Sequence, residues 1–307
     1  MKMTLRSWVL GLLLLMGCRT ESPPNFLVLG HIYYWDDPRD RVDPRVAALD
    51  LSGYDGVWLV GDLARKSSER TTTLDTLNQK FDFGDPNVHW ALGNHDLYKG
   101  DSARIVARTG RPTFHYAPEV APGWNLLVLN TELFSPPERI LDEAHCAQLE
   151  RQLALAKRVT KLQQPDEYLI VLHHGAVIPQ VRADTFPRLS QIWNVYHPER
   201  MAHCSGGTFA EALLPYFDRA AQRGVSVVFI GGDLGQRVKR FEHRDAHGIL
   251  WLGTGIGNSA GTFRSAPAAV TDFSPDHVLL VEPDPQTRAF THRFVPLSDL
   301  PLESTLD

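Results

Sequence analysis

The chain has 307 residues and a formal net charge of −5, with a composition ordinary for a soluble globular protein. This length is enough to bury one large hydrophobic core or two small ones. The mildly acidic balance and the absence of any run of Lys or Arg argue against a nucleic-acid partner.

The first residues have the features of an export signal. Lys2 and Arg6 give a positive start, and the apolar stretch over 8–16 is too short to span a membrane as a stable helix. The stretch ends in Leu-Met-Gly-Cys18, which resembles the bacterial lipobox. This resemblance implies that residues 1–17 are removed and that lipid on Cys18 anchors an exported chain to a bacterial membrane, facing the periplasm or the exterior. An uncleaved anchor, or an ordinary signal peptide with a chance cysteine, is the alternative.

Short apolar runs alternate with helical patterns after a tether over residues 18–25. Such runs are typical of the buried strands of a mostly parallel sheet. Five of them end in polar residues and occupy residues 25–29, 56–60, 88–92, 168–172 and 225–230. A further strand is predicted over 124–130, and strands in meander order over 237–244, 249–253, 277–281 and 287–294.

Helices are predicted between these strands. Asp43 has the position of an N-cap and Pro44 that of the first helical residue before 45–51. Further helices are predicted over 68–80, over 142–162 and, interrupted near Pro215, over 208–223. No repeat or linker divides the chain, so residues 26–307 are predicted to form one layered α/β domain with antiparallel strands toward its C-terminal side.

Export would place Cys146 and Cys204 in an oxidising compartment. Because Cys146 falls in a predicted helix, two separate buried thiols are expected rather than a disulfide. The long connection over 174–203 is rich in Pro, Trp, Tyr and His. It is compatible with a cover over a site that contacts substrate, or with a plain insertion packed by Trp193 and Tyr196.

Polar clusters stand at the ends of five predicted strands. Ligand sites in open α/β sheets form just beyond the carboxyl ends of the strands, so these clusters are expected to converge. Together they offer hard oxygen and imidazole ligands for a metal ion. The clusters are Gly30-His31, Gly61-Asp62, Gly93-Asn94-His95-Asp96, His173-His174 and Gly231-Gly232-Asp233.

Gly61-Asp62, Gly93-Asn94-His95-Asp96 and His173, in this order and at these intervals, resemble the calcineurin-like metallophosphoesterase family. The resemblance implies a four-layer α/β/β/α sandwich that holds divalent metals such as Mn, Fe, Zn or Ni and hydrolyses phosphoesters. By resemblance, Asp62 bridges two metals, and Asn94 and His173 are metal ligands. His95 matches a histidine that contacts phosphate and protonates the leaving oxygen, and Asp96 matches the residue that orients it.

The sequence departs from the family pattern at both ends of the motif set. The opening Asp-x-His is here His31-Ile-Tyr33, a second Asp after Gly-Asp is replaced by Arg65, and the late Gly-His-x-His has become Gly-Gly-Asp233-Leu. These changes remove most ligands of one metal, so one ion is favoured over two. His31 and Asp233 are candidate replacement ligands, and Tyr33 is a candidate ligand for ferric ion or hydrogen-bond partner for phosphate.

Three functions remain open. The favoured one is a metal-dependent phosphoesterase, exported and membrane-tethered, acting on a phosphorylated small molecule or another phosphoester. The second is a catalytically silent relative that binds a phosphorylated or polysaccharide ligand, with Trp35, Trp193 and Tyr196 at the rim. The third is a structural lipoprotein on a borrowed fold. The first is favoured because the sequence retains Asp62 and Asn94 for metal binding and the His95-Asp96 pair for protonation of the leaving group.

Overall fold

The computed structural model describes residues 23–34, 41–134, 143–178, 182, 186, 188–194, 207–257, 270–284 and 286–304. The predicted signal sequence and Cys18 lie outside these residues, as do Trp35 and Tyr196. Within the described ranges, no helix combines the length and the apolar character needed to cross a lipid bilayer.

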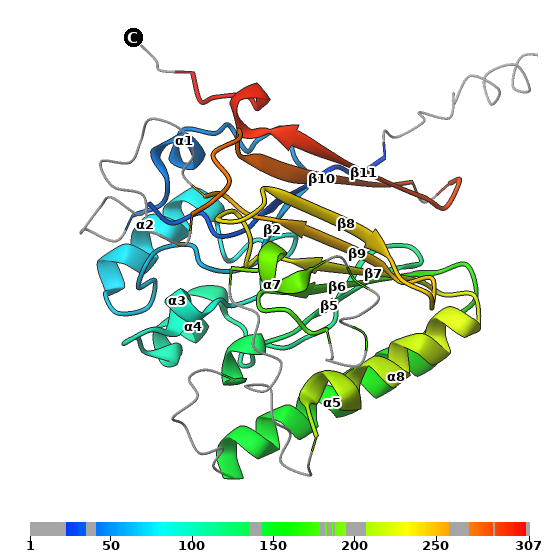
Figure 1. Ribbon diagram of the computed structural model, residues 1–307. Helices are drawn as coiled ribbons and strands as arrows, with labels where there is room; N and C mark the ends of the chain where they lie inside the picture. The colour runs from blue at the N-terminus through cyan, green and yellow to red at the C-terminus, as the bar shows by residue number, and fades with distance from the viewer. Residues whose placement is uncertain are drawn as a thin grey trace, which may run out of the picture.

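Two mixed β-sheets form the centre of the fold (Figure 1). The first has the order β11-β10-β1-β2-β3, in which β1, β2 and β3 are parallel. The second has the order β4-β5-β6-β7-β9-β8, in which β5, β6, β7 and β9 are parallel. The strands of the first sheet are β1 (Phe26–Leu29), β2 (Gly56–Leu59), β3 (His89–Trp90), β10 (His277–Asp284) and β11 (Ala289–Pro296). Those of the second are β4 (Glu119–Ala121), β5 (Trp124–Val128), β6 (Tyr168–His173), β7 (Ser226–Gly231), β8 (Arg240–Arg244) and β9 (Leu250–Thr254).

Helices cover the outer face of each sheet. On the side of the first sheet, α1 (Pro44–Ala47), α2 (Thr71–Phe81) and α4 (Ser102–Thr109) contribute buried residues to one apolar cluster. On the side of the second, α5 (Glu143–Leu162), α7 (Leu189–Ile192) and α8 (Phe209–Gln222) do the same. The remaining short helices are α3 (Asn94–Leu97), η1 (Thr131–Phe134) and η3 (Leu297–Asp299).

Side-chain alternation along the strands builds the layers. In β6, Leu169 and Val171 pack on the helical side, whereas Ile170 and Leu172 pack in the cluster between the sheets. The same alternation in β2 directs Trp58 inward and Leu59 outward. Each buried strand therefore contributes to two apolar layers, which confirms the predicted four-layer α/β/β/α sandwich.

The predicted meander order of the C-terminal strands is wrong. β8 and β9 form an antiparallel pair in the second sheet, whereas β10 and β11 form another in the first. β10 pairs with β1, so the chain changes sheets between β9 and β10. Apolar runs alone do not reveal which sheet receives each hairpin.

The predicted interruption of the helix near Pro215 is also wrong, because α8 continues through the proline. An interior proline costs about 3 kcal/mol. The cost is offset by a buried apolar face that includes Leu213, Leu214 and Phe217, and by the capping box between Thr208 and Glu211.

The expectation of two separate buried thiols is wrong as well. Cys146 is disulfide-bonded and is only partly buried on α5. The other cysteines of the chain, Cys18 and Cys204, lie outside the described residues. A thiol on a partly buried helix turn remains accessible for pairing, which the helix prediction did not take into account.

His89 on β3 makes stability depend on pH. The ring is buried, and neither ring nitrogen has a hydrogen-bond partner in the described part of the chain. Burial, aided by the charge of Arg111, lowers the pKa of His89 from 6.5 to about 3. As the pH falls below 6.5, the unfolded chain takes up a proton that the folded chain does not, so the free energy of unfolding decreases.

Between pH 7 and pH 5, we expect the free energy of unfolding to fall by about 2 kcal/mol less in the His89→Leu variant than in the unaltered chain. Urea denaturation at the two pH values measures the difference. His277→Leu is the control, because His277 is partly exposed and its Nδ1 bonds the Pro275 carbonyl. Equal acid sensitivity of His89→Leu and the unaltered chain would contradict the prediction.

Candidate metal centre and active site

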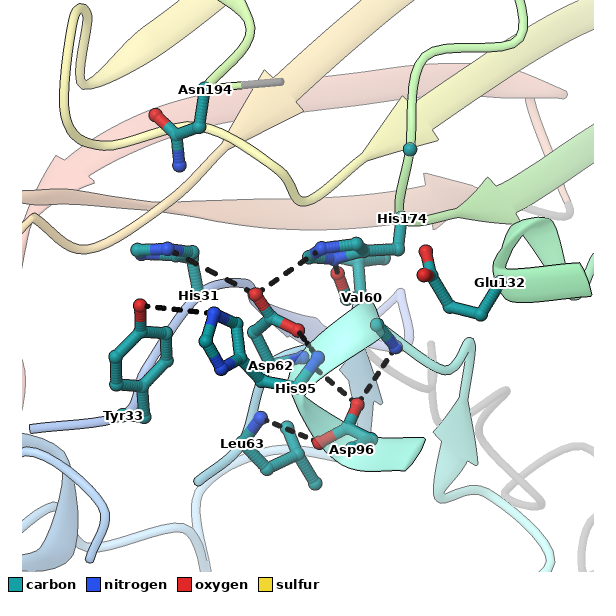
Figure 2. A network of polar contacts seen from close by, with 12 residues as sticks. His31, Tyr33, Val60, Asp62, Leu63, His95, Asp96, Glu132, His174 and Asn194 are labelled. Atoms are coloured by element: carbon teal, nitrogen blue, oxygen red, sulfur yellow. Dashed lines mark hydrogen bonds and ion pairs between the residues drawn. The ribbon is translucent and has the colours of Figure 1, made fainter. Parts of the chain in front are cut away.

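The ends of strands from both sheets meet at one place, which Figure 2 shows from close by. The backbone N–H of His31, after β1, donates to the Gly61 carbonyl at 2.9 Å. In the second sheet, the His174 carbonyl accepts from the Asp233 backbone N–H at 3.2 Å, and between the sheets Nδ1 of His174 bonds the Val60 carbonyl after β2 at 2.8 Å. The loops after β1, β2, β6 and β7 are thus joined directly, as expected where parallel strands present their carboxyl ends together.

Unusual backbone conformations place the two central side chains. His31 and Asp62 have φ values of 51° and 58°, in the left-handed region that non-glycine residues adopt at a cost of about 1–2 kcal/mol. Two glycines allow the close approach. A Cβ on Gly93 would collide with the Asp62 carboxylate, and one on Gly61 would collide with the His174 ring. Strain of this kind persists where surrounding structure enforces it, often at functional sites.

The Asp62 carboxylate is the centre of the cluster, and its side chain is 1% exposed. Oδ1 accepts from the His95 backbone N–H at 2.9 Å. Oδ2 lies 3.4 Å from Nε2 of His174 and 4.0 Å from Nε2 of His31. Burial by itself raises the pKa of Asp62, but the attraction of His174, His95 and His31 outweighs it, and the pKa is lower than usual. Asp62 is therefore an anion at neutral pH.

Both imidazoles are oriented by backbone carbonyls. Nδ1 of His31 lies 3.0 Å from the Ile256 carbonyl, and Nδ1 of His174 lies 2.8 Å from that of Val60. A carbonyl only accepts, so each Nδ1 carries a proton and each Nε2 is turned toward Asp62. This is the orientation in which histidines bind metals, with the second nitrogen donating to a carbonyl.

The two imidazoles differ in protonation. Burial lowers the pKa of His31 to about 4, so this ring is neutral at neutral pH. Burial also acts to lower the pKa of His174, but the Asp62 carboxylate, followed by Asp233 and Glu132, raises it well above 6.5. The negative charge of Asp62, which makes the largest contribution, thus favours a positive charge on the His174 ring.

As they stand, the described residues contain no group of three or more His, Cys, Asp and Glu side chains that could hold a metal ion. The donors around Asp62 come nearest to such an arrangement. Nε2 of His174 is buried without a hydrogen-bond partner, and it faces the Asp62 carboxylate together with Nε2 of His31. Ligand atoms about 2.0–2.2 Å from one ion lie about 3–4 Å from each other, which matches both separations. One carboxylate and two imidazoles suit Mn, Fe, Zn or Ni.

Asp96 does not orient His95, contrary to the role implied by the family resemblance. Its buried carboxylate accepts from donors around Asp62 instead. Burial and the Asp62 charge raise the pKa of Asp96, and hydrogen bonds to it act in the opposite direction. The donors are the backbone N–H groups of Asp62, Leu63 and Gly93, the Ser67 hydroxyl and the Trp90 indole. Asp96 therefore fixes the loop that carries Asp62.

His95 is half-buried beside this cluster. Its Nδ1 bonds the Arg65 carbonyl at 3.0 Å, and its Nε2 lies 3.4 Å from the Tyr33 hydroxyl. The Tyr33 ring has centroid distances of 4.8 Å to His31 and 4.7 Å to His95. Burial and the charges of Asp62 and Asp233 raise the pKa of Tyr33, so it stays a neutral phenol that hydrogen-bonds His95.

His173 lies on the wrong face of β6 to join the cluster. Its Nδ1 bonds the Gly175 carbonyl at 2.8 Å, and its ring is 5.9 Å from Trp193 and 5.8 Å from Phe229. The adjacent His174 faces Asp62 instead, so the structure brings together His174 rather than His173 with the predicted aspartate.

The two other candidate ligands lie near the cluster. Asp233 is buried, and its charge raises the pKa of both His174 and Tyr33. Asn94 is half-buried at the first position of α3, and its amide is not part of the hydrogen-bond network of the described residues.

Glu132 is not among the residues predicted from sequence, and Figure 2 shows it directed toward His174. It follows β5 on η1, and in its ionised form it contributes to the raised pKa of His174. Burial raises the pKa of Glu132 to about 8, aided by the charges of Asp62 and Asp233. The strand before Glu132 is predicted from sequence, so the polar residues at its end are a signal that could identify this residue.

The long connection after β6 packs against the core and also holds the loop after β7. Trp193 is buried in the outer core of the second sheet, as expected for a packed insertion. Next to it, the Asn194 side chain donates to the Leu234 carbonyl and accepts from the Gln236 N–H. This part of the connection therefore holds the loop that contains Asp233.

Comparison with known proteins gives a consistent result. A family model described as calcineurin-like phosphoesterase matches residues 26–202. Among solved structures, a dimetal phosphatase from Danio rerio matches with a TM-score of 0.52 and 15% identity, over 85% of this chain and 93% of that one. A phosphopantetheinyl hydrolase from Mycobacterium tuberculosis matches with a TM-score of 0.43 and 13% identity, over 86% and 98% of the two chains. No curated protein sequence matches this chain.

Proposed function

We propose, because this chain belongs to the calcineurin-like phosphoesterase family, that it is a metal-dependent phosphoesterase with a rearranged centre for one cation. The observation that carries the proposal is the arrangement of Asp62. One of its carboxylate oxygens faces two imidazole Nε2 atoms, and the Nδ1 atoms of both rings are bonded to carbonyls.

Asp62, His31 and His174 are the residues that would hold the cation. When bound, a cation there would polarise a phosphoryl oxygen and lower the pKa of a coordinated water. Asp62 supplies the negative charge, and the two imidazoles add ligands without charge when His174 is deprotonated. The cation and the His174 proton would occupy the same position beside Asp62, so His174 would lose this proton when the cation binds.

His95 is placed to handle the proton of the leaving oxygen. Its Nδ1 bonds the Arg65 carbonyl, which leaves Nε2 as the atom that gains and gives a proton. The Tyr33 hydroxyl 3.4 Å away accepts from the protonated ring and donates to the neutral one. Tyr33 thus orients His95 in both states, and general acid catalysis of this kind contributes about 10²–10⁴-fold.

The substrate we propose is a phosphoester of a small molecule. The half-buried position of His95 leaves it accessible at the edge of the cluster, and the net charge of −5 disfavours a polyanion. We also propose that the chain is exported and tethered to a membrane by lipid on Cys18. The support is the sequence pattern of residues 1–18.

Metal removal tests the proposed function. We expect the purified chain to hydrolyse an aryl phosphate ester, to lose this activity after chelation, and to regain it with Zn²⁺, Mn²⁺, Fe²⁺ or Ni²⁺. Elemental analysis should find one ion per chain. Tight binding of a phosphorylated ligand without turnover would favour the silent relative, and no bound metal together with no hydrolysis would refute the proposal.

A further inference from the structure

An ionic cluster lies behind His31 and consists of the buried Asp43, Lys239 and Asp276 with the partly exposed Arg45. Lys239 is only 3% exposed and Asp276 only 2%. Such residues are almost never buried unless they are paired. A buried ion pair is often no more stabilising than apolar residues of similar volume, so stability is a weak explanation for this cluster.

The Asp276 carboxylate joins three segments. Its Oδ1 accepts from Nζ of Lys239 and from the backbone N–H of Gly257, both at 2.9 Å. Its Oδ2 accepts from the Arg45 guanidinium at 2.7 Å. Lys239 also donates to the Gly235 carbonyl at 2.7 Å. One carboxylate thus connects α1, the loop after β7 and the loop after β9.

A single peptide group links Asp276 to the candidate metal centre. The N–H of Gly257 and the carbonyl of Ile256 belong to the same planar unit, in which they point in opposite directions. Asp276 holds the N–H, and the carbonyl accepts from Nδ1 of His31 at 3.0 Å. Fixing one side of this plane therefore fixes the acceptor on the other side.

Arg45 gives the segment that carries His31 a second tie to Asp276. It bonds the Asp43 carboxylate at 2.8 Å while bonding Asp276. The backbone N–H of Asp43 in turn donates to the carbonyl of Ile32 at 2.8 Å. The segment that carries His31 and the peptide that orients its ring are thus held by the same carboxylate.

We propose that Asp276 is a positioning residue that acts on His31 through the Ile256–Gly257 peptide. By holding the Gly257 N–H, it directs the Ile256 carbonyl at His31, keeps the proton on Nδ1 and leaves Nε2 facing Asp62. The positioning itself is a property of the metal-free chain, and only its consequence for a cation rests on the proposed function.

Two double variants that differ only in the side chain at position 276 test this role. Lys239→Met/Asp276→Asn and Lys239→Met/Asp276→Leu remove the same two charges with side chains of similar volume, and Arg45 keeps Asp43 as its partner. Only asparagine retains an oxygen for the Gly257 N–H. In the metal-free proteins, ¹⁵N-correlated NMR of the imidazoles should show His31 as a single Nδ1–H tautomer in the asparagine variant and as a tautomer mixture in the leucine variant. The signal is assigned by its loss in His31→Gln.

The same spectrum of the unaltered chain gives a check that needs no substitution at the cluster. His31 is expected as one Nδ1–H tautomer with a slowly exchanging ring proton. A mixture or the Nε2–H tautomer there would overturn the proposal even if the leucine variant did not fold. Identical His31 spectra in the two double variants would also overturn it.

Zinc binding measures the consequence for the centre. We expect competition titration with Zn²⁺ alone to give an affinity about 10–100-fold weaker for the leucine variant than for the asparagine variant. Equal affinities would overturn the positioning role toward the cation. If the unaltered chain bound no zinc, the proposed function would fail, while the tautomer comparison in the metal-free proteins would still decide the role of Asp276.

Discussion

Replacing Asp62 with asparagine is expected to reduce kcat/KM for a phosphoester by about 10³-fold or more, a loss of about 4 kcal/mol of transition-state stabilisation. Asp62 is the carboxylate faced by both imidazole Nε2 atoms, so the change removes the negative charge that would hold the cation. Asparagine has nearly the same shape, tolerates a positive φ and still accepts from the His95 N–H. Bound metal, measured on the purified variant, should fall together with activity.

Asp82→Asn is the matched control. Asp82 also has a positive φ, of 47°, but it is exposed at the end of α2. The same chemical change there should leave activity and metal content unaltered. An Asp62→Asn variant that is folded, retains its metal and hydrolyses substrate at a normal rate would refute the assigned centre.

Local patterns predicted most of the fold because strands that are buried on both faces are uniformly apolar in sequence. The runs before Gly61 and His173 are uniformly apolar, as strands buried between two layers must be. The same patterns could not assign the C-terminal hairpins to sheets, since β9 and β10 are both buried strands of ordinary apolar content. Which sheet each joins is decided by long-range packing.

In the candidate site, too, some features could be predicted from local sequence and others could not. The positions of the polar clusters followed from the ends of the strands, so Asp62 and His31 could be selected before their contact was known. The choice between His173 and His174 depended on side-chain parity. Leu172 faces the other sheet and Val171 faces the helices, so a count of two along β6 directs His173 outward and His174 inward. That count was available in the sequence.

Other features of the site could not be obtained from pattern alone. The five donors to Asp96 come from the loop after β2, from β3 and from the loop after β3, and nothing in their spacing specifies that arrangement. The positive φ values of His31 and Asp62 likewise cannot be inferred from residue type, because most histidines and aspartates have a negative φ. These features depend on how the ends of the two sheets meet.

The structure also shows where the residues of the changed motif lie around Asp62. A histidine at position 31 brings an imidazole where the family pattern has a carboxylate, and its low pKa keeps that imidazole neutral. Tyr33, in place of a histidine, fills the adjacent space with a phenol that supports His95. The changes reduce the number of metal ligands on one side while retaining Asp62, which is consistent with one cation rather than two.

Exchanging the two adjacent histidines for alanine, one at a time, gives the second large effect. His174→Ala removes an imidazole whose Nε2 lies 3.4 Å from the Asp62 carboxylate, so we expect kcat/KM to fall by about 10²-fold or more and metal affinity to fall with it. His173→Ala removes a buried ring that contacts Trp193 and Phe229 on the helical side. Its expected effect is a loss of stability of about 2–4 kcal/mol, with activity per folded molecule within about threefold of normal.

Kinetics, metal content and urea denaturation of both variants decide between the two positions. Side chains alternate along β6, so His174 faces the Asp62 carboxylate and His173 faces the apolar core. Replacing His174 should therefore reduce activity, and replacing His173 should reduce stability. If His173→Ala instead abolished metal binding while His174→Ala left it intact, the family-derived ligand would be correct. The centre would then have to form through a rearrangement of the end of β6 that turns His173 toward Asp62.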